Sequence, residues 1–175
     1  KQSSKRADVI VVTKCRAELS AAEKQKIIHE LNPLPKQQVF FSEIVYDEPY
    51  HLFGGGKGIL NASTDVLLVC GIASPKPLKD FLTTHVHTYD MIRYPDHHIF
   101  TTDDLTEIKK HYEKLNPSSR IILTTEKDAV RLQKFRKELA DYPVYVLPIR
   151  HRFMFDEAEK FESVITAFIG SFTRR

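Results

Sequence analysis

The amino-acid sequence predicts an α/β fold in which a mostly parallel sheet carries helices on both faces. From residue 63 onward, apolar strand segments and helix-forming segments alternate four times. Two of the strand segments, 66–69 and 121–123, are apolar at every position, which is typical of parallel strands that are covered on both faces. Right-handed crossovers then place the intervening helices on both sides of the sheet. We therefore expect a compact Rossmann-like architecture.

Local signals define the expected elements. A strand over 7–13 precedes a helix that Ser20 caps with Glu23 three residues later, and Asn32-Pro33 ends that helix. The segment 38–46 is rich in β-branched and aromatic residues, which predicts the next strand. In the regular part we expect strands at 66–70, 86–92, 120–123 and 144–147, and helices at 77–84, 103–115, 127–139 and 156–169.

A glycine-rich segment, Gly54 to Gly58, separates the first strands from the regular part. Its glycines can adopt positive φ, so we expect a hairpin or a flexible crossing between two lobes, with 47–62 as the linker. The phosphate-loop spacing G-x-x-x-x-G-K-[ST] is absent, because no hydroxyl residue follows Lys57. Gly71 follows a strand and would let a ligand approach backbone N–H groups, but a tight strand-to-helix turn also needs glycine.

Charge and cysteine content argue against several classes of protein. The 26 basic and 23 acidic residues of this 175-residue chain are interspersed, which favours a solvated mixed surface and no nucleic-acid partner. Two cysteines at the ends of apolar runs fit reduced thiols better than a disulfide framework. No apolar stretch approaches the ~20 residues of a spanning helix. A buried-looking strand begins almost at once without an initiator Met, so we expect a fragment of a larger protein.

Polar clusters follow two of the predicted strands, at Asp96-His97-His98 and at 124–128. The carboxyl ends of parallel strands line the crevice that receives ligands, so both clusters are expected at one rim of the sheet. Each also has a structural explanation. Asp96 can cap a turn with surface histidines behind it, and a threonine followed by acids in the first helical turn complements the helix dipole.

A metal site is a further possibility for these histidines, since imidazole and carboxylate groups are ordinary ligands of zinc or manganese. His85 and His87 straddle the start of the strand that Asp96 and its neighbours follow, and ~8 residues of strand separate the two groups by well over 20 Å. They cannot share one ion, and we expect no metal site built from both. Asp96-His97-His98 also matches the triplet of metal-dependent DHH phosphoesterases, but the aspartates that those enzymes need at neighbouring strand ends are missing after Cys70.

Taken jointly and in order, these motifs resemble the tetraacyldisaccharide 4'-kinase family, lipid kinases of lipid A synthesis in Gram-negative bacteria. The resemblance runs from about Ala7 to Phe168, and the segment 125–130 is its most specific piece. The matching residues are Gly71, Ile72, Pro75, Phe81, Asp96, His97, His98, Phe100, Thr101, Asp104 and Thr125 to Val130.

The resemblance implies a larger N-terminal lobe, with a Walker-type phosphate loop and the catalytic aspartates, and a smaller C-terminal lobe that closes over it. Residues 1–46 would be the end of the N-terminal kinase lobe, 47–62 a hairpin hinge, and 63–175 the Rossmann-like C-terminal lobe. In that family the γ-phosphate of ATP passes to the 4'-hydroxyl of the lipid A disaccharide-1-phosphate, at the cytoplasmic face of the bacterial inner membrane. ATP and Mg²⁺ would be bound mainly by the N-terminal lobe, so this chain alone is expected to be inactive.

The same resemblance implies the roles of five residues. His97 is the expected catalytic contribution of this lobe, with Asp96 fixing its tautomer and His98 as the less favoured histidine. Lys127 and Thr125 would approach the nucleotide phosphates, although an ion pair of Lys127 with Glu126 or Asp128 is an equal alternative. Lys14 would approach the adenine, but Arg16 stands where an acid is expected.

Two rival interpretations stay open at this point. One is a stand-alone Rossmann-like module that binds a small ligand or a partner. The other is the DHH-type phosphoesterase, which predicts a manganese ion at Asp96 to His98.

Overall fold

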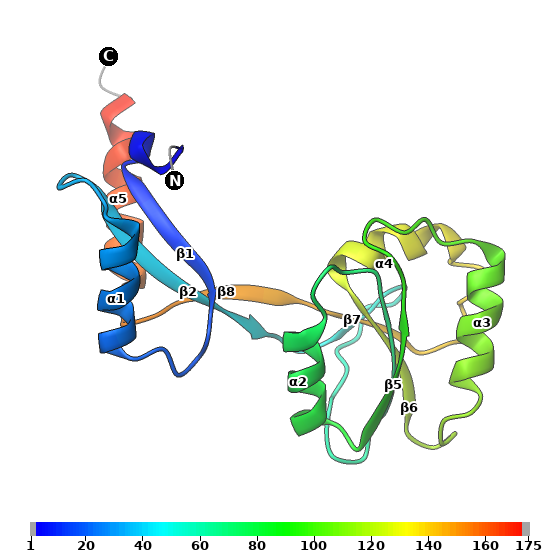
Figure 1. Cartoon of the computed structure of the whole chain (residues 1–175). Helices are drawn as coiled ribbons and strands as arrows, with labels where there is room; N and C mark the ends of the chain where they lie inside the picture. Colours follow the sequence, from blue (N-terminus) through cyan, green and yellow to red (C-terminus); the bar gives the residue numbers. More distant parts are fainter. Residues whose placement is uncertain (1–2, 173–175) are drawn as a thin grey trace. The chain divides into compact units, whose positions relative to one another are not determined.

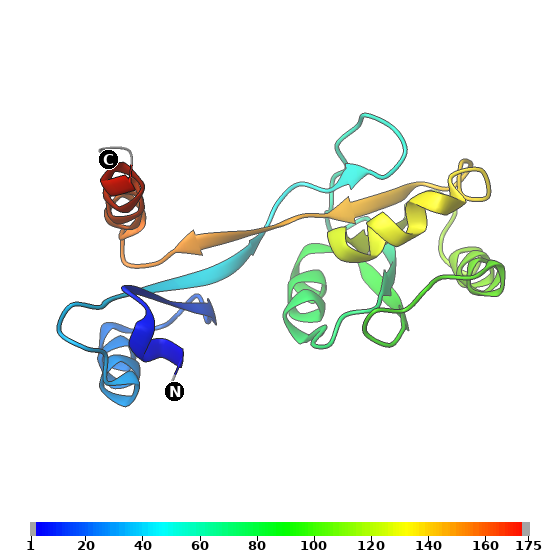
Figure 2. The same cartoon turned by 90° about the horizontal axis from the view of Figure 1, so that it is seen from above.

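The structure is a computed structural model that describes residues 3–172, and the chain forms two compact units. One contains the residues up to Val45 together with those from Arg150 onward, and the other contains Tyr46–Ile149. Figures 1 and 2 show the elements of both units in two views. Since both units have the α/β organisation, with strands and helices alternating along the chain, the predicted fold class is confirmed.

The smaller unit has a three-stranded sheet in the order β1-β2-β8. Strand β1 runs parallel to β2, with Val9 opposite Gln38. Phe40 and Phe41 of β2 are fully buried on opposite faces: Phe40 packs 5.3 Å from the ring of Phe161, and Phe41 faces Lys24. Helices α5 and α1 therefore cover opposite faces. The elements are η1 (Ser3–Arg6), β1 (Val9–Cys15), α1 (Ala21–Leu31), β2 (Gln38–Tyr46), β8 (Ile149–Phe153) and α5 (Ala158–Phe172).

The larger unit has a five-stranded sheet in the order β3-β7-β6-β4-β5. Strand β4 pairs in parallel with β5 and β6, β6 pairs in parallel with β7, and the short edge strand β3 is antiparallel to β7. The mostly parallel sheet is thus confirmed. Its elements are β3 (Tyr50–His51), β4 (Asp65–Cys70), α2 (Lys76–His85), β5 (Thr88–Arg93), α3 (Thr102–Tyr112), β6 (Arg120–Thr125), α4 (Glu126–Leu132), η2 (Gln133–Phe135) and β7 (Val144–Leu147).

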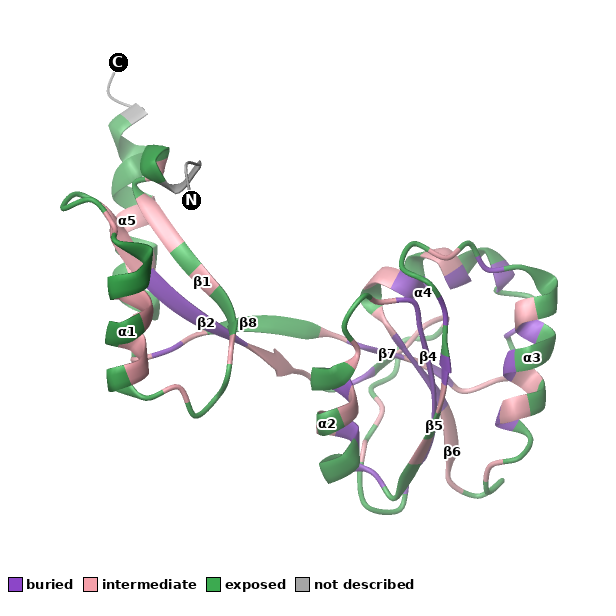
Figure 3. Cartoon of the chain, in the orientation of Figure 1, coloured by how far each residue is buried: buried purple, intermediate pink, exposed green. Residues whose placement is uncertain are grey.

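Strand β4 is buried along its whole length and divides the core of this unit in two (Figure 3). Leu67 and Val69 pack with residues of α3 and α4, whereas Val66 and Leu68 pack with residues of α2 on the other face. A strand that is covered on both faces has no polar face to offer, which is why residues 66–70 of β4 are continuously apolar.

The strand order reverses at β4. The chain leaves β4 for β5 on one side and then returns to β6 on the other side. In open α/β sheets the crevice at such a switch point, beyond the carboxyl ends of the strands, is where ligands bind. The segments that meet there follow β4, β5 and β6.

Three details differ from the sequence-based expectations. The glycine-rich segment does turn back, because Tyr50 bridges Lys57 in antiparallel fashion, but none of the described glycines has positive φ. Gly58 is needed for another reason: a Cβ there would lie 2.8 Å from the ring of Tyr145. The expected helix 127–139 is shorter, since α4 ends at Leu132 and continues as the 3₁₀ helix η2. Strand β8 was not expected at all.

The division into units also differs from the predicted boundaries. Residues 47–62 pack with the larger unit, and the residues from Arg150 onward belong with the first 45 residues instead of the regular sheet. The cause is strand β8, which follows β7 after Pro148 and joins β2 at the edge of the three-stranded sheet. The chain therefore passes between the units twice, after Val45 and after Ile149.

Candidate functional site

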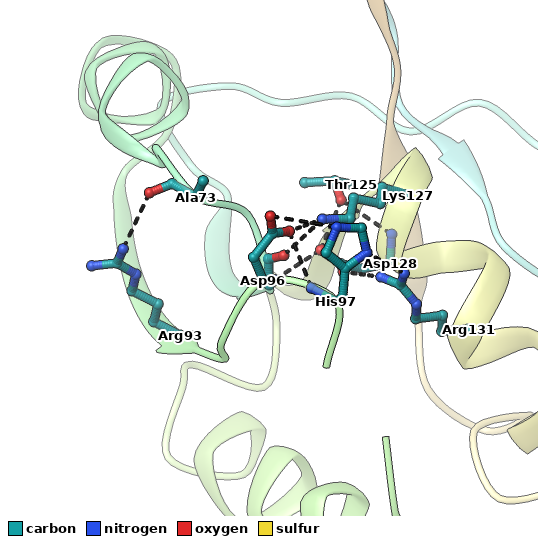
Figure 4. Close-up of polar contacts among 9 residues, drawn as sticks. Ala73, Arg93, Asp96, His97, Thr125, Lys127, Asp128 and Arg131 are labelled. Carbon is teal, nitrogen blue, oxygen red and sulfur yellow. Dashed lines mark hydrogen bonds and ion pairs between the residues drawn. The ribbon is translucent and has the colours of Figure 1, made fainter. Parts of the chain in front are cut away.

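The segments that follow β4, β5 and β6 meet in one polar cluster, shown in Figure 4. Lys127, at the start of α4, forms an ion pair with Asp96 in the turn after β5. The same ammonium group lies 3.3 Å from the carbonyl oxygen of Gly71, which follows β4. The expectation that both polar clusters share one rim of the sheet is therefore confirmed.

Asp128 is the buried centre of this cluster. Its side chain is fully inaccessible to solvent, and its Oδ2 accepts hydrogen bonds from the Gly71 N–H and the Thr125 hydroxyl, both at 2.8 Å. Its Oδ1 faces the Arg131 guanidinium, with Nη1 at 3.6 Å. A buried carboxylate is tolerated only where donors and a cation compensate its lost hydration. Asp128 thus ties the end of β4 to the start of α4.

Gly71 is required at this point by close approach. A Cβ on Gly71 would lie 2.9 Å from the carbonyl oxygen of Pro95 and 3.3 Å from Asp128 Oδ1. The turn after β5 therefore packs directly on the backbone that follows β4.

Cys70 is buried in the last position of β4. Burial raises the pKa of its thiol above the ordinary value, so Cys70 is a packing residue here and an unreactive thiol.

His97 is the exposed and conformationally unusual member of the turn. Its φ is 63°, in the left-handed region that few residues other than glycine adopt, and its side chain is 75% exposed. The backbone N–H donates to Asp96 Oδ1 at 3.1 Å. Arg131 Nη2 lies 3.3 Å from His97 Nδ1, whereas Asp96 Oδ2 lies 3.7 Å from His97 Nε2. Asp96 Oδ2 is too far from His97 Nε2 for a hydrogen bond, and the role of Asp96 in fixing the His97 tautomer stays a prediction.

His98 has a structural environment that separates it from His97. Its ring stacks on Tyr94 at 4.4 Å between centroids, and Nε2 donates to Asp104 Oδ2 at 2.9 Å. Asp104 also closes a capping box with Thr101 at the start of α3. Burial by itself would raise the pKa of Asp104, but the hydrogen bonds from His98 and Thr101 hold that pKa below its ordinary value. His98 is thus part of the cap of α3.

The remaining predicted residues have the following positions. Thr125 caps α4: its hydroxyl accepts from the Asp128 N–H at 3.2 Å and donates to the carboxylate of Asp128, as its capping explanation predicted. Lys127 pairs with Asp96 and not with Glu126 or Asp128. Lys14 lies in the smaller unit, at a bulge of β1 with φ 60°, where it lines a surface hollow of about 490 Å³ with Thr13 and Arg16.

The histidines before β5 are unrelated to this cluster. His85 stacks on Phe81, and His87 hydrogen-bonds Asp65 at the start of β4.

Within residues 3–172, no three His, Cys, Asp or Glu side chains gather in a way that could hold a metal ion. The same range contains no helix that is both long and apolar enough to cross a membrane.

The model of the tetraacyldisaccharide-1-P 4'-kinase family, LpxK, matches residues 1–170. The chain belongs to the tetraacyldisaccharide 4'-kinase family. The family assignment made from the motifs of the sequence is thereby confirmed.

Curated members of this family include proteins of Phocaeicola vulgatus, 33% identical over 97% of this chain, and Parabacteroides distasonis, 34% identical over 96% of it. Both are named tetraacyldisaccharide 4'-kinase. The chain spans about half the length of these relatives, 48% and 47%. A crystal structure of LpxK from Aquifex aeolicus in complex with ATP aligns with a TM-score of 0.48 at 16% identity, over 91% of this chain and 51% of that one.

Two members of the cluster have roles that sequence reasoning missed. Asp128 was interpreted as an acid that favours the helix start, whereas it is the buried link between two strand ends. Arg131 was not singled out. The signal that would have found it is its spacing, because a residue three positions after Asp128 lies on the same face of the helix.

Proposed function

We propose that this chain is the C-terminal portion of an ATP-dependent lipid kinase that phosphorylates the 4'-hydroxyl of tetraacyldisaccharide 1-phosphate in lipid A biosynthesis. The observation that carries the proposal is the family match over residues 1–170. The cluster at the switch point of the larger sheet supports it, because that is the position at which α/β proteins bind their ligands. The proposed partners are ATP and the lipid, at the cytoplasmic face of the inner membrane.

In the proposed reaction the 4'-oxygen bonds to the γ-phosphorus of ATP, the bond from that phosphorus to ADP breaks, and the hydroxyl proton passes to a base. Mg²⁺ neutralises charge on the transferred group when bound. We assign ATP and Mg²⁺ mainly to the N-terminal part of the full-length protein. This chain would contribute donors, because His97 and Lys127 lie at one rim and both suit anionic oxygens.

The five predicted residues have unequal support within this proposal. His97 is exposed, held in a strained backbone conformation and oriented by a cation, which are features of functional positions. Asp96 acts by pairing with Lys127 and by accepting the His97 N–H. Thr125 is occupied as a helix cap, so its contribution to phosphate binding is through the position of Lys127. Lys14 remains the proposed contact to adenine.

The test is 4'-kinase activity on lipid A disaccharide-1-phosphate with ATP and Mg²⁺. We would compare this chain, the full-length protein and its His97→Ala variant. The matched control is His87→Ala, which removes another exposed histidine from an Asp–His pair, at the opposite end of the sheet. We expect His97→Ala to lose about 100-fold in rate while staying folded, His87→Ala to retain full activity, and this chain alone to be inactive. A full-length protein that transfers no phosphate would refute the proposal.

A further inference from the structure

We propose that Arg131 is a positioning residue for His97. Its guanidinium, ion-paired with the buried carboxylate of Asp128, donates to His97 Nδ1 and leaves the Nε2–H group as the one that His97 presents to a ligand. The inference rests on the proposed function in one respect, because it takes His97 as the group that serves phosphoryl transfer. The contact itself is visible in Figure 4.

The chemistry of the two side chains decides the direction of the hydrogen bond. A guanidinium has five N–H donors and no acceptor. The 3.3 Å contact between Arg131 Nη2 and His97 Nδ1 can therefore be a hydrogen bond only if Nδ1 is unprotonated. In a neutral imidazole the proton is then on Nε2. In this arrangement His97 is a hydrogen-bond donor towards its exposed side and not a proton acceptor.

Asp96 does not compete for this role. Its Oδ2 lies 3.7 Å from His97 Nε2, beyond hydrogen-bond distance. Its Oδ1 pairs with Lys127 and accepts the backbone N–H of His97. Asp96 therefore holds the backbone of the turn, and Arg131 holds the ring.

The guanidinium is itself fixed by burial. The Arg131 side chain is 28% exposed, and Asp128 is fully buried. Since Asp128 Oδ2 is occupied by Gly71 and Thr125, its Oδ1 is the oxygen that faces Arg131. Arg131 thus connects the exposed ring of His97 to the buried junction of β4 and α4. The 3.6 Å contact between Arg131 Nη1 and Asp128 Oδ1 is an ion pair and longer than a hydrogen bond, so Asp128 holds the guanidinium by charge while Nη2 meets the ring of His97.

The first test is the tautomer of His97 in this 175-residue chain. With ¹⁵N-labelled histidine imidazoles, long-range proton–nitrogen NMR correlations report which ring nitrogen carries the proton. At a pH where the ring is neutral, we expect wild-type His97 to be almost entirely the Nε2–H form. In Arg131→Met, which has no donor, the two nitrogen resonances should shift towards each other as the tautomers mix. Lys134→Met, an exposed cation three residues further along, should leave them in place.

The wild-type measurement needs no variant, so it keeps the proposal open to refutation even if Arg131→Met unfolds. A mixture of tautomers in the wild-type chain would overturn the inference. So would an Arg131→Met spectrum in which the His97 nitrogens are unmoved.

The second test uses the full-length protein. We expect Arg131→Met to lower kcat about tenfold while the KM for ATP changes less than about twofold, since a misoriented donor affects the reacting geometry more than binding. Arg131→Lys should recover part of the lost kcat. Lys134→Met should have the kcat of the wild-type enzyme. An Arg131→Met enzyme with unchanged kcat would overturn the positioning role. If the full-length protein has no kinase activity, the proposed function fails. If the wild-type chain nevertheless shows a single His97 tautomer, the Arg131 contact stands.

Discussion

The two ends of the parallel sheet in the larger unit both carry histidines and aspartates, but they are built differently. At the amino end, His87 bonds directly to Asp65 at 2.9 Å, and the histidine is 67% exposed. At the carboxyl end, His97 and Asp96 are neighbours in sequence, yet the ring of His97 bonds to Arg131 and Asp96 pairs with Lys127. Adjacency in the sequence therefore does not predict which groups pair.

Charged groups are concentrated at the carboxyl end of this sheet. The pair at the amino end links the starts of two neighbouring strands. The cluster at the carboxyl end joins segments that follow three strands, through one buried carboxylate and the cations around it. A change at the carboxyl end should therefore reach further than a matched change at the amino end.

The strongest test of this contrast is Asp128→Ala. Removing a fully buried carboxylate leaves the Gly71 N–H and the Thr125 hydroxyl without their acceptor and the Arg131 guanidinium without its counter-ion, so we expect a loss of about 3–5 kcal/mol in the free energy of unfolding. His87→Ala, at the other end, should cost about 1 kcal/mol because one hydrogen bond of an exposed side chain is lost. Urea unfolding followed by NMR at individual residues measures the free energy of unfolding of this unit by itself. Equal losses for the two variants would remove the contrast.

A smaller effect is expected from Gly71→Ala. The added Cβ would lie 2.9 Å from the Pro95 carbonyl oxygen, so the turn must shift, at a cost of about 2 kcal/mol. Gly55→Ala is the matched control, since a Cβ there meets nothing within 4 Å. NMR chemical shifts of Asp96 and His97 should move in Gly71→Ala and stay in Gly55→Ala. A turn that is unmoved by Gly71→Ala would show that the close packing after β4 does not position it.

The sequence was sufficient for most strands of the two sheets because their signals are local. Continuous apolar runs identify the buried strands, and β7 and β2 have the predicted bounds, 144–147 and 38–46. The capping boxes at Ser20 and Thr101 mark where helices begin. Strand β8 was missed because four of its five residues are exposed. A strand of mixed polar residues at a sheet edge has no period that distinguishes it from a loop.

The site was predicted in part, for the same physical reason. Its location follows from strand ends, which the sequence reveals, so Asp96, His97, Thr125 and Lys127 were all placed at the correct rim. The pairing within the rim depends on side-chain geometry between segments about 30 to 60 residues apart, which no local pattern encodes. That is why Asp128 and Arg131, the buried link and the cation that holds His97, became evident only from the structure.

The two adjacent histidines of the turn, His97 and His98, should also differ in their contribution to stability. His98→Ala removes the stack on Tyr94 and the hydrogen bond to Asp104, so a loss of about 1–2 kcal/mol in stability is expected. His97→Ala should change stability by less than about 0.5 kcal/mol, because an exposed side chain contributes little. Thermal unfolding of the two variants under identical conditions provides the comparison. If His97→Ala were the less stable of the two variants, the structural role would belong to His97 and not to His98.

The smallest expected effect concerns acid. The pKa of Asp104 is lowered in the folded chain, because hydrogen bonds from His98 and Thr101 outweigh the effect of burial. Its stabilisation is therefore fully present above the unfolded value of about 3.9 and is lost as the pH falls through the lower folded value. We expect Asp104→Asn to be less stable than wild type by about 1 kcal/mol at pH 6 and the two to converge as the pH falls through the folded pKa of Asp104. The pKa of Asp90 is lowered mainly by its hydrogen bond from His111, and its side chain is half exposed. Because solvent screens an exposed pair, Asp90→Asn should show the same pH trend with a smaller loss of stability. Urea midpoints measured from pH 6 to pH 2 decide the matter: a wild-type advantage over Asp104→Asn that persists unchanged to pH 2 would mean that this carboxylate does not stabilise the turn through its charge.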